Sequence, residues 1–473
     1  MAVVLPAFKQ AEPEGIELVQ LAYLTWLEGQ EAERFEKYKM FRDYYEGEHA
    51  AQLTARIRKF LELQDSQEFS LNFCPIVVDA LAEKLKVASF DCGKDKMLAE
   101  LTAAWWEFNR MDAQQGVVHT AAVRDGDTYV LVEWDNEEKM PRFTQENAYD
   151  GSEGLHLVYS DERRRYPVVA IKRWTINEPG QGGQALTTKR TNLYYPDRIE
   201  KYTDYGRGGA WQPYGEPGEE WPIPWTDTGR AGGQPLGISV VHWRNKDQGY
   251  SYGESELEDV VPLSNAGNKS VLDLLGAADT NGFPIFTGTG WDGTGKTVAP
   301  GIIWWSTDPA ASFGSIPAGD LNGLIALKDS ITADIGKVSR TPLSFFQLTG
   351  QVAAAGTLKE QREGLNAKIA DRQTCFGNAW EDVMAIGRRL HNVWGSGTLD
   401  VKQRISTTWV DPEAPTPKER ADEVDAATRA GAMSTATKVR TLHPDWDDDR
   451  IDAEVALIRD EMGLAVPEIG PVA

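Results

Sequence analysis

A stretch of small residues between two helical patterns constrains the fold of this chain most strongly. Residues 348–356 are rich in glycine and alanine, and the helical pattern before them ends near Arg340. In the pattern after them, apolar residues recur at steps of three, four and seven, which keeps one stripe of a long helix facing a core. The stripe consists of Leu358, Leu365, Ile369, Phe376, Trp380, Val383 and Leu390. The segment predicts an adaptable loop between two rigid helices, suited to a partner that slides past it.

The charge balance argues against a surface that binds nucleic acid tightly. The chain has 473 residues, with 72 Asp and Glu against 49 Lys and Arg, which gives a formal net charge of −23. Affinity for phosphates comes mainly from Lys and Arg, so tight wrapping of DNA is not expected, although contact without strong binding remains open. A chain of this length should divide into two to four domains.

The sequence gives little support for a metal site, a disulfide or a membrane-spanning segment. The three cysteines, Cys74, Cys92 and Cys375, are far apart and form no C-x-x-C pair, which argues against disulfides and thiolate zinc sites. The histidines show no metal-binding spacing. No apolar run approaches the roughly 18 residues of a membrane span, and the first residues lack the pattern of a secretory signal. We therefore expect a soluble protein of a reducing cytoplasm, with no cofactor.

The order of patterns predicts an α+β protein, mostly helical with antiparallel β elements. We expect helices at 27–45, 51–63, from Pro75 onward, and at 98–108, 113–123, 255–278, 321–338, 418–430, 434–442 and 448–462. Strands of one antiparallel sheet are expected at 127–134, 155–159, 166–174, 191–195 and 198–205, with a further strand at 240–244. Residues 206–237 predict an extended region, and 281–317 a compact β insert between two helices.

The stretch from Gly290 to Thr297 matches the phosphate-loop motif G-x-x-x-x-G-K-T letter for letter. The motif would place Lys296 on nucleotide phosphates and Thr297 on magnesium, but it requires a helix directly after the loop. Pro300 and Gly301 stand where the second turn of that helix would be. The pattern favours a glycine-rich turn in the β insert, and a nucleotide-binding enzyme remains the alternative.

With these elements in order, the chain resembles the portal proteins of tailed bacteriophages, specifically the siphophage-type family common in phages of actinobacteria. The matching segments cover most of the chain and are 44–49, 71–73, 77–85, 125–133, 252–257, Asn265, Asn268, 341–342 and 359–390. No single segment decides the resemblance, which rests on their order. One departure is that the insert is short for a clip with a helix of its own.

The resemblance implies a ring-forming portal fold divided into wing, stem, clip and crown. The implied regions are the wing at 1–250, stem helices at 251–280 and 319–340, the clip at 281–318, the tunnel loop at 341–356, the long wing helix and its return at 357–411, and the crown at 412–473. In the tunnel loop, the residues implied to meet DNA are Gln347, Gln351, Val352, Ala353 and Ala354. In the clip, the residues implied to dock partners are Trp291, Lys296, Trp304 and Trp305.

The function implied by the resemblance is that of a passive conduit and not of an enzyme. About a dozen copies would form a ring at one capsid vertex, through which double-stranded DNA is packaged and ejected. The terminase large subunit and then head–tail adaptor proteins would dock at the clip, and the major capsid and scaffolding proteins would be further partners. Such a protein belongs to the virion and is assembled in the host cytoplasm. A capsid or tail protein without a DNA channel is a second alternative.

Overall fold

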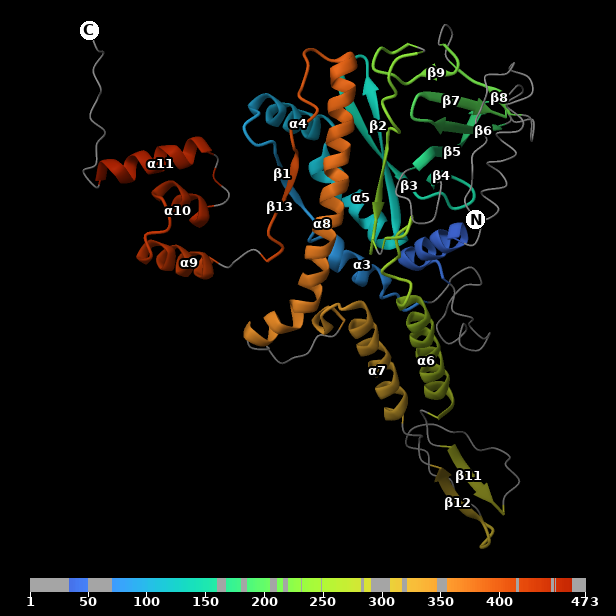
Figure 1. Cartoon of the computed structure of the whole chain (residues 1–473). Coiled ribbons are helices and arrows are strands. Elements are labelled where there is room, and N and C mark those ends of the chain that lie inside the picture. The colour runs from blue at the N-terminus through green and yellow to red at the C-terminus, as the bar shows by residue number, and fades with distance from the viewer. Residues whose placement is uncertain are drawn as a thin grey trace, which may run out of the picture. The chain divides into compact units, whose positions relative to one another are not determined.

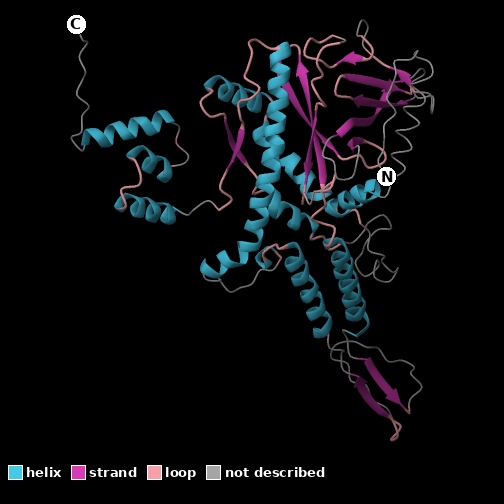
Figure 2. Cartoon of the chain, in the orientation of Figure 1, coloured by secondary structure: helices cyan, strands magenta, loops and turns pink. Residues whose placement is uncertain are grey.

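The computed structural model describes most of the chain, which divides into two compact units, Met1–Val410 and Asp411–Ala473 (Figure 1). The described residues are 34–49, 70–159, 167–179, 185–204, 211–215, 220–230, 232–247, 249–281, 285–290, 307–316, 321–346, 355–413, 417–443, 446 and 448–461. The boundary falls just before residues 412–417, a sequence with three prolines that is typical of a linker. Helices and antiparallel strands both contribute to the first unit, as the α+β prediction requires (Figure 2).

Helices of the first unit follow their local signals. After a helix at 34–46 come α3 (Cys74–Ala82), α4 (Lys96–Phe108), α5 (Met111–Asp125), α6 (Val260–Asn281), α7 (Asn322–Ser339) and α8 (Ala355–Trp394), with a 3-10 turn, η2 (Leu343–Phe345). Pro75 lies in the first turn of α3, as predicted. Asp95 caps α4 by accepting from the amide of Leu98, and Gly126 ends α5 with φ of 93°. The helix predicted at 51–63 lies outside the described residues.

The predicted single antiparallel sheet is wrong, because the strands form two larger sheets. One has the order β10-β2-β3, from Val240–Arg244, Asp127–Asp135 and Met140–Asn147. The other has the order β4-β5-β6-β7-β8, from Gly154–Tyr159, Pro167–Pro179, Ala185–Tyr194, Arg198–Thr203 and Gln212–Pro213, with β9 (Ile223–Pro224) also paired to β7. Strand β10 returns from far along the chain to pair with β2, so hydrophobic alternation alone could not separate the two sheets.

Two smaller antiparallel pairs complete the first unit. In one, β1 (Val87–Asp91) pairs with β13 (Ser406–Trp409), and neither strand was predicted from the local pattern of residues. In the other, β11 (Ile285–Thr289) pairs with β12 (Ser312–Ile316), in register from Ile285 opposite Ile316 to Thr289 opposite Ser312. The second pair confirms the β character predicted for the insert between α6 and α7.

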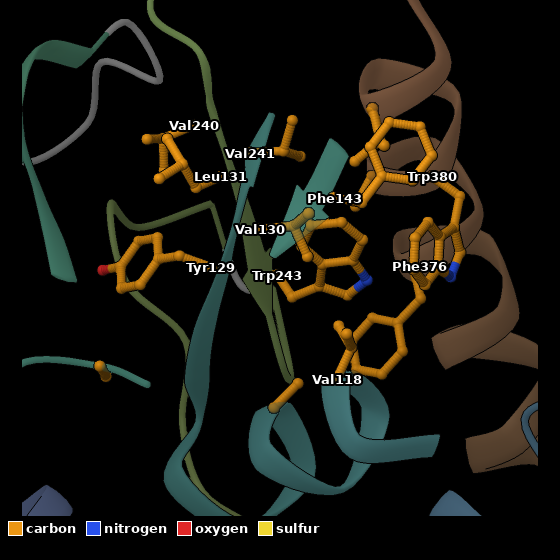
Figure 3. Close-up of a cluster of buried hydrophobic side chains, with 14 of the residues drawn as sticks. Val118, Tyr129, Val130, Leu131, Phe143, Val240, Val241, Trp243, Phe376 and Trp380 are labelled. Carbon is orange, nitrogen blue, oxygen red and sulfur yellow. The ribbon is translucent and has the colours of Figure 1, made fainter. Parts of the chain in front are cut away.

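The core of the first unit forms where α8 crosses the β10-β2-β3 sheet (Figure 3). Trp380 of α8 and Trp243 of β10 are both fully buried, with ring centroids 5.0 Å apart in an edge-on arrangement. Phe376 lies one turn before Trp380 and stacks on His119 of α5 at 5.5 Å. The part of the predicted apolar stripe from Leu365 onward is buried, and its residues Phe376 and Trp380 face α5 and the sheet, which fixes α8 to these elements.

The second unit is a small helical module with a core of its own. It contains α9 (Pro417–Arg429), α10 (Thr435–Leu442) and α11 (Asp448–Glu461), close to the three helices predicted from sequence. Ser434 accepts a hydrogen bond from the amide of Thr437 at 3.3 Å, which caps α10. Val439, Ile451 and Val455 form its buried cluster.

Candidate channel segment and its anchorage

The residues predicted to meet DNA or docking partners fall outside the described part of the chain. These are Gln347, Gln351, Val352, Ala353 and Ala354 of the loop, and Trp291, Lys296, Trp304 and Trp305 of the insert. The structure does describe the segments on either side of the loop, from α7 through Phe346 and from Ala355 onward. The site is therefore built from the residues that hold the end of α7 and the segment leading into the loop, and that join them to α8.

The chain leaves α7 through a tightly specified turn. Arg340 adopts the left-handed conformation, with φ of 54°, and the amide of Thr341 donates to Gly336 O at 2.9 Å. The Ser339 hydroxyl donates to Ile335 O at 2.7 Å and contacts the Thr341 hydroxyl at 2.9 Å. Phe346 then packs edge-on against Phe73, with centroids 5.7 Å apart. The segment leading into the loop is thus fixed against the residues that precede α3.

A buried ionic cluster joins the end of α7 to α8. Lys368 of α8 donates to Glu256 Oε2 at 2.6 Å and to the main-chain oxygen of Ser339 at 2.8 Å. Arg372, one turn later, donates to Glu256 Oε1 at 2.9 Å and to Asn245 Oδ1 at 2.5 Å. All three charged side chains are under a tenth exposed. The cluster therefore ties the C-terminus of α7, the long helix and the segment before α6 to one carboxylate.

The electrostatics of the cluster favour an ionised Glu256. Burial on its own would raise the pKa of this carboxyl, but Lys368, Lys246 and Arg372 outweigh burial and lower the pKa to about 2. Burial lowers the pKa of the Lys368 ammonium, and Glu256 opposes that shift. The cations outnumber the single carboxylate. The Ser339 carbonyl oxygen supplies Lys368 with a further hydrogen-bond acceptor. Removing the carboxylate would leave the cations buried without their main partner.

Helix α6 is held to the N-terminal segments by the side-chain amides of Asn265 and Asn268. Asn268 accepts from the amide of Leu71 at 2.6 Å and donates to its carbonyl at 3.3 Å, as a strand neighbour would. Asn265 accepts from the hydroxyl of Tyr44 at 2.8 Å. Upstream, the amide of Gly253 donates to Asp127 Oδ1 at 2.8 Å, where the chain leaves the β10-β2-β3 sheet. Segments that carry the sequence resemblance therefore meet at the base of α6.

Comparison with known protein families identifies the family of this chain, which the contacts described above do not. The model of the family described as "Phage portal protein, SPP1 Gp6-like" matches residues 24–465, which is most of the chain. The chain belongs to this phage portal family. The portal protein of Mycobacterium phage D29 is 24% identical over 378 residues, covering 75% of this chain and 71% of that protein. The portal protein of Mycobacterium phage L5 is 23% identical over 379 residues, with the same coverage.

Membership confirms the resemblance found in the sequence and the prediction that the chain is not an enzyme. The portal family is a structural, non-enzymatic component of the virion, and it associates as a homo-oligomeric ring with the capsid. Among the helices that the structure describes, none combines the length and apolar character of a membrane span. Within the same described ranges, no cluster of His, Cys, Asp or Glu has the arrangement of a metal site.

The phosphate-loop match of this portal chain follows a strand in the wrong context for nucleotide binding. Gly290, with φ of 73°, comes directly after β11, whose partner is the antiparallel strand β12. Phosphate loops instead follow a strand and open onto a helix whose amides bind the phosphates. Lys296 and Thr297 themselves lie outside the described residues. The described flank of the motif is therefore that of an antiparallel pair.

Sequence reasoning missed the buried cluster of Glu256, Lys368 and Arg372 at the end of α7. The pattern at 255–278 predicts a helix that begins at Ser255 and has Glu256 in its first turn, where an acidic side chain complements the helix dipole. In the structure α6 begins at Val260, and the Ser255 hydroxyl donates to Arg124 O and accepts from the amide of Leu257. The sequence held no clear signal for the cluster, because Asp371, three residues after Lys368 and next to Arg372, supplies an acidic neighbour on α8 itself.

Proposed function

We propose that this chain forms a ring of about 12 copies at one vertex of the capsid, through which double-stranded DNA is packaged and later ejected. The family match over residues 24–465 carries the proposal. The order of α6, the β11–β12 pair, α7 and the 40-residue helix α8 supports it, because it supplies two adjacent helices, a β insert between them and a long helix leading back to the sheets.

Each region takes one part of this task. Residues 1–250 and 357–411 form the wing, 251–280 and 319–340 the stem, 281–318 the clip, 341–356 the tunnel loop and 412–473 the crown. The ionic cluster of Glu256, Lys368 and Arg372 ties the end of α7, which leads into the tunnel loop, to the part of α8 that follows the loop in the chain. The loop can then adapt to moving DNA while the helix before it stays in place.

The tunnel loop contacts DNA without holding it. Gln347 and Gln351 touch the phosphate backbone by weak hydrogen bonds, and Val352, Ala353 and Ala354 contact it by shape alone. None of these side chains is positively charged, and the whole chain carries a net charge of −23, so the phosphates meet little attraction. DNA therefore passes in either direction without sequence preference.

Docking partners bind the clip. The terminase large subunit, which supplies ATP-driven motion from outside this chain, binds Trp291, Lys296, Trp304 and Trp305 during packaging. A head–tail adaptor protein takes the same surface afterwards. Tryptophan suits this role because its large, rigid ring buries apolar area at interfaces. The major capsid and scaffolding proteins surround the ring.

Placing a charge in the tunnel loop tests the conduit directly. We expect Ala353→Lys to assemble normally but to slow DNA packaging and ejection, most strongly at low salt, because a ring of lysines would attract phosphates. Ala353→Ser is the matched control and should behave like the parent protein. Equal packaging rates for Ala353→Lys and the parent at low salt would contradict the proposal that DNA passes this loop.

Removing two aromatic rings tests the clip. The double variant Trp304→Ala, Trp305→Ala should form rings yet bind the terminase large subunit at least about tenfold more weakly, since tryptophans are common binding hot spots. Tyr250→Ala removes an exposed aromatic side chain elsewhere in the first unit and should leave binding unchanged. Undiminished terminase binding by the double variant would remove these residues from the docking surface.

A further inference from the structure

Exposed cations gather where two segments of the first unit meet. Two come from the start of α4 and the residues before it, and two from the segment between α8 and β13, namely Lys94, Lys96, Lys402 and Arg404. All four side chains are exposed, and in the described part of the chain none of them lies in an ion pair. A chain with a formal net charge of −23 therefore presents, at this place, a group of cations that its own described carboxylates do not pair.

Hydrogen bonds to main-chain oxygens hold the two segments side by side. Gln403 Nε2 donates to the carbonyl oxygen of Cys92 at 2.7 Å, just before the turn that leads into α4. The buried guanidinium of Arg388 in α8 donates to three carbonyl oxygens of the other segment at 3.0, 2.8 and 2.6 Å, those of Asp400, Val401 and Gln403. Figure 1 shows α4 beside the chain that runs from α8 to β13. The four cations therefore stand on a surface whose backbone is fixed.

The aspartates of these segments are engaged by the chain itself. Asp91 and Asp400 each accept from the amide two residues later, at 2.8 and 2.9 Å, and Asp95 caps α4. Burial lowers the pKa of Arg388, and the carboxylates of Asp400 and Asp95 oppose that shift, so both lie within electrostatic reach of this buried cation. The charged groups that remain to meet a partner are the four exposed cations.

Two exposed apolar side chains lie next to these cations. Met97 is 53% exposed and follows Lys96, and Val401 is 56% exposed and precedes Lys402. Apolar side chains bordered by charged ones are typical of contacts between proteins, which have an apolar centre and a polar rim. Surfaces that bind nucleic acid are more polar and more strongly positive. The unbranched thioether of Met97 can adapt its shape to an apolar partner.

We propose that this basic surface, made of residues 94–97 and 401–404, binds an acidic amphipathic segment of another protein. The apolar side chains of the segment cover Met97 and Val401, and its carboxylates pair with the cations around them. Charge complementarity selects the partner, because an acidic segment is attracted here and is repelled by most of this acidic chain. The surface uses residues outside the proposed clip and tunnel loop, so the inference goes beyond the proposed conduit and does not depend on it.

Charge reversal tests the cations. The probe is a synthetic amphipathic peptide of Leu, Ala and Glu, whose binding to the full chain is measured by fluorescence anisotropy. Lys94→Glu combined with Arg404→Glu should weaken binding at least about tenfold, because like charges then face each other across the contact. Arg110→Glu combined with Lys139→Glu makes the same change in net charge at two other exposed cations and should bind like the parent. Equal weakening by both pairs would reduce the effect to net charge and overturn the assignment.

Removing the apolar side chains tests the centre of the surface. Met97→Ser combined with Val401→Ser should weaken peptide binding even at high salt, where the contribution of the cations is screened. Tyr250→Ser changes an equally exposed large side chain elsewhere in the first unit and should leave binding unchanged. Near-ultraviolet circular dichroism should be that of the parent in all these variants, since every changed side chain is exposed. Parent-like binding of the double variant at high salt would refute the apolar contact.

Competition and mass measurements exclude other occupants. Duplex DNA at the same concentration of charge should displace little of the peptide, and complete displacement would identify nucleic acid as the ligand and overturn the proposal. The chain with Lys94→Glu and Arg404→Glu should assemble to the same mass as the parent in light scattering. A loss of assembly would instead assign this surface to a contact between copies. Rings of the parent chain that bind no peptide would overturn this inference and leave the proposed conduit standing.

Discussion

Lys368 donates a 2.6 Å hydrogen bond to the carboxylate of Glu256, although the two residues are 112 positions apart in the chain. Both are almost fully buried, and the same ammonium also donates to the carbonyl of Ser339 at the end of α7. One lysine therefore links the long helix α8, the end of α7 and the segment before α6. This contact ties the helix that leads into the proposed tunnel loop to the helix that follows it.

Neutralising Glu256 should destabilise the first unit strongly. Glu256→Gln leaves Lys368 and Arg372 buried without their anion, which costs about 3–5 kcal/mol when one partner of a buried pair is removed. Glu258→Gln is the control, because Glu258 pairs with Lys37 at 2.8 Å with both side chains over 40% exposed, a contact worth about 1 kcal/mol at most. Urea unfolding of both variants measures the difference. Equal losses would show that the cluster contributes no more than a surface pair.

His119 should make stability depend on pH. Its Nε2 accepts from Trp380 Nε1 at 2.9 Å and its Nδ1 lies 2.9 Å from Leu85 O, so it is neutral. Burial lowers the pKa of His119 from 6.5 to about 4. The unfolded chain therefore binds a proton at this histidine below about pH 6.5, whereas the native chain binds it only below about pH 4. Stability from this group is complete above pH 6.5 and falls by roughly 3 kcal/mol as the pH drops to 4.

A substitution at His119 isolates that contribution. His119→Gln removes the titrating ring, so its free energy of unfolding should change less steeply between pH 6.5 and 4 than that of the parent. His443→Gln, at an exposed position in the second unit, should leave the slope unchanged. Identical slopes for His119→Gln and the parent would contradict the buried neutral state.

Gly253 should tolerate no side chain. A Cβ at this position would collide with the carbonyl oxygen of Gly126 and lie 2.5 Å from that of Asn245, both backbone atoms that cannot move aside. We expect Gly253→Ala to cost roughly 3 kcal/mol or more in denaturant unfolding. At Gly323 of α7 a Cβ meets nothing within 4 Å, so Gly323→Ala should be neutral or stabilise by up to about 1 kcal/mol. Similar effects of the two substitutions would contradict the close approach at Gly253.

The second unit should be dispensable for folding of the first. Its helices have their own buried cluster, Val439, Ile451 and Val455, and the division of the chain falls after Val410. A chain ending at Val410 should keep the near-ultraviolet circular dichroism of its buried tryptophans and the thermal midpoint of the first unit. A loss of cooperative unfolding on truncation would show that the two units fold together.

Local sequence signals predicted most of the helices, but they did not predict which distant strands pair with one another. Pro75 marked the start of α3, and the stripe through Phe376 and Trp380 marked the buried face of α8. By contrast, β10 pairs with β2 from more than a hundred residues away, and β1 pairs with β13 at still greater separation. Such pairings depend on tertiary contacts that alternation of residue types does not encode.

The cluster of Glu256, Lys368 and Arg372 could not be predicted from the sequence for a related reason. In the sequence, Glu256 is an ordinary acidic residue at the start of a predicted helix, and Arg372 is one of the charges expected on the solvent-facing sides of the long helix. Only the fold brings them together, with separations of 112 and 116 positions. Their low exposure follows from where α8 crosses the segment before α6, which no periodicity in either segment specifies.

Cryo-electron microscopy of the purified full-length protein, with its mass measured by light scattering, tests the central claim most directly. The proposal predicts closed rings of about 12 copies of the 52.4 kDa chain, roughly 630 kDa, around a bore wide enough for duplex DNA. Sheets, tubes or shells of this chain, without a closed ring whose bore admits DNA, would contradict it.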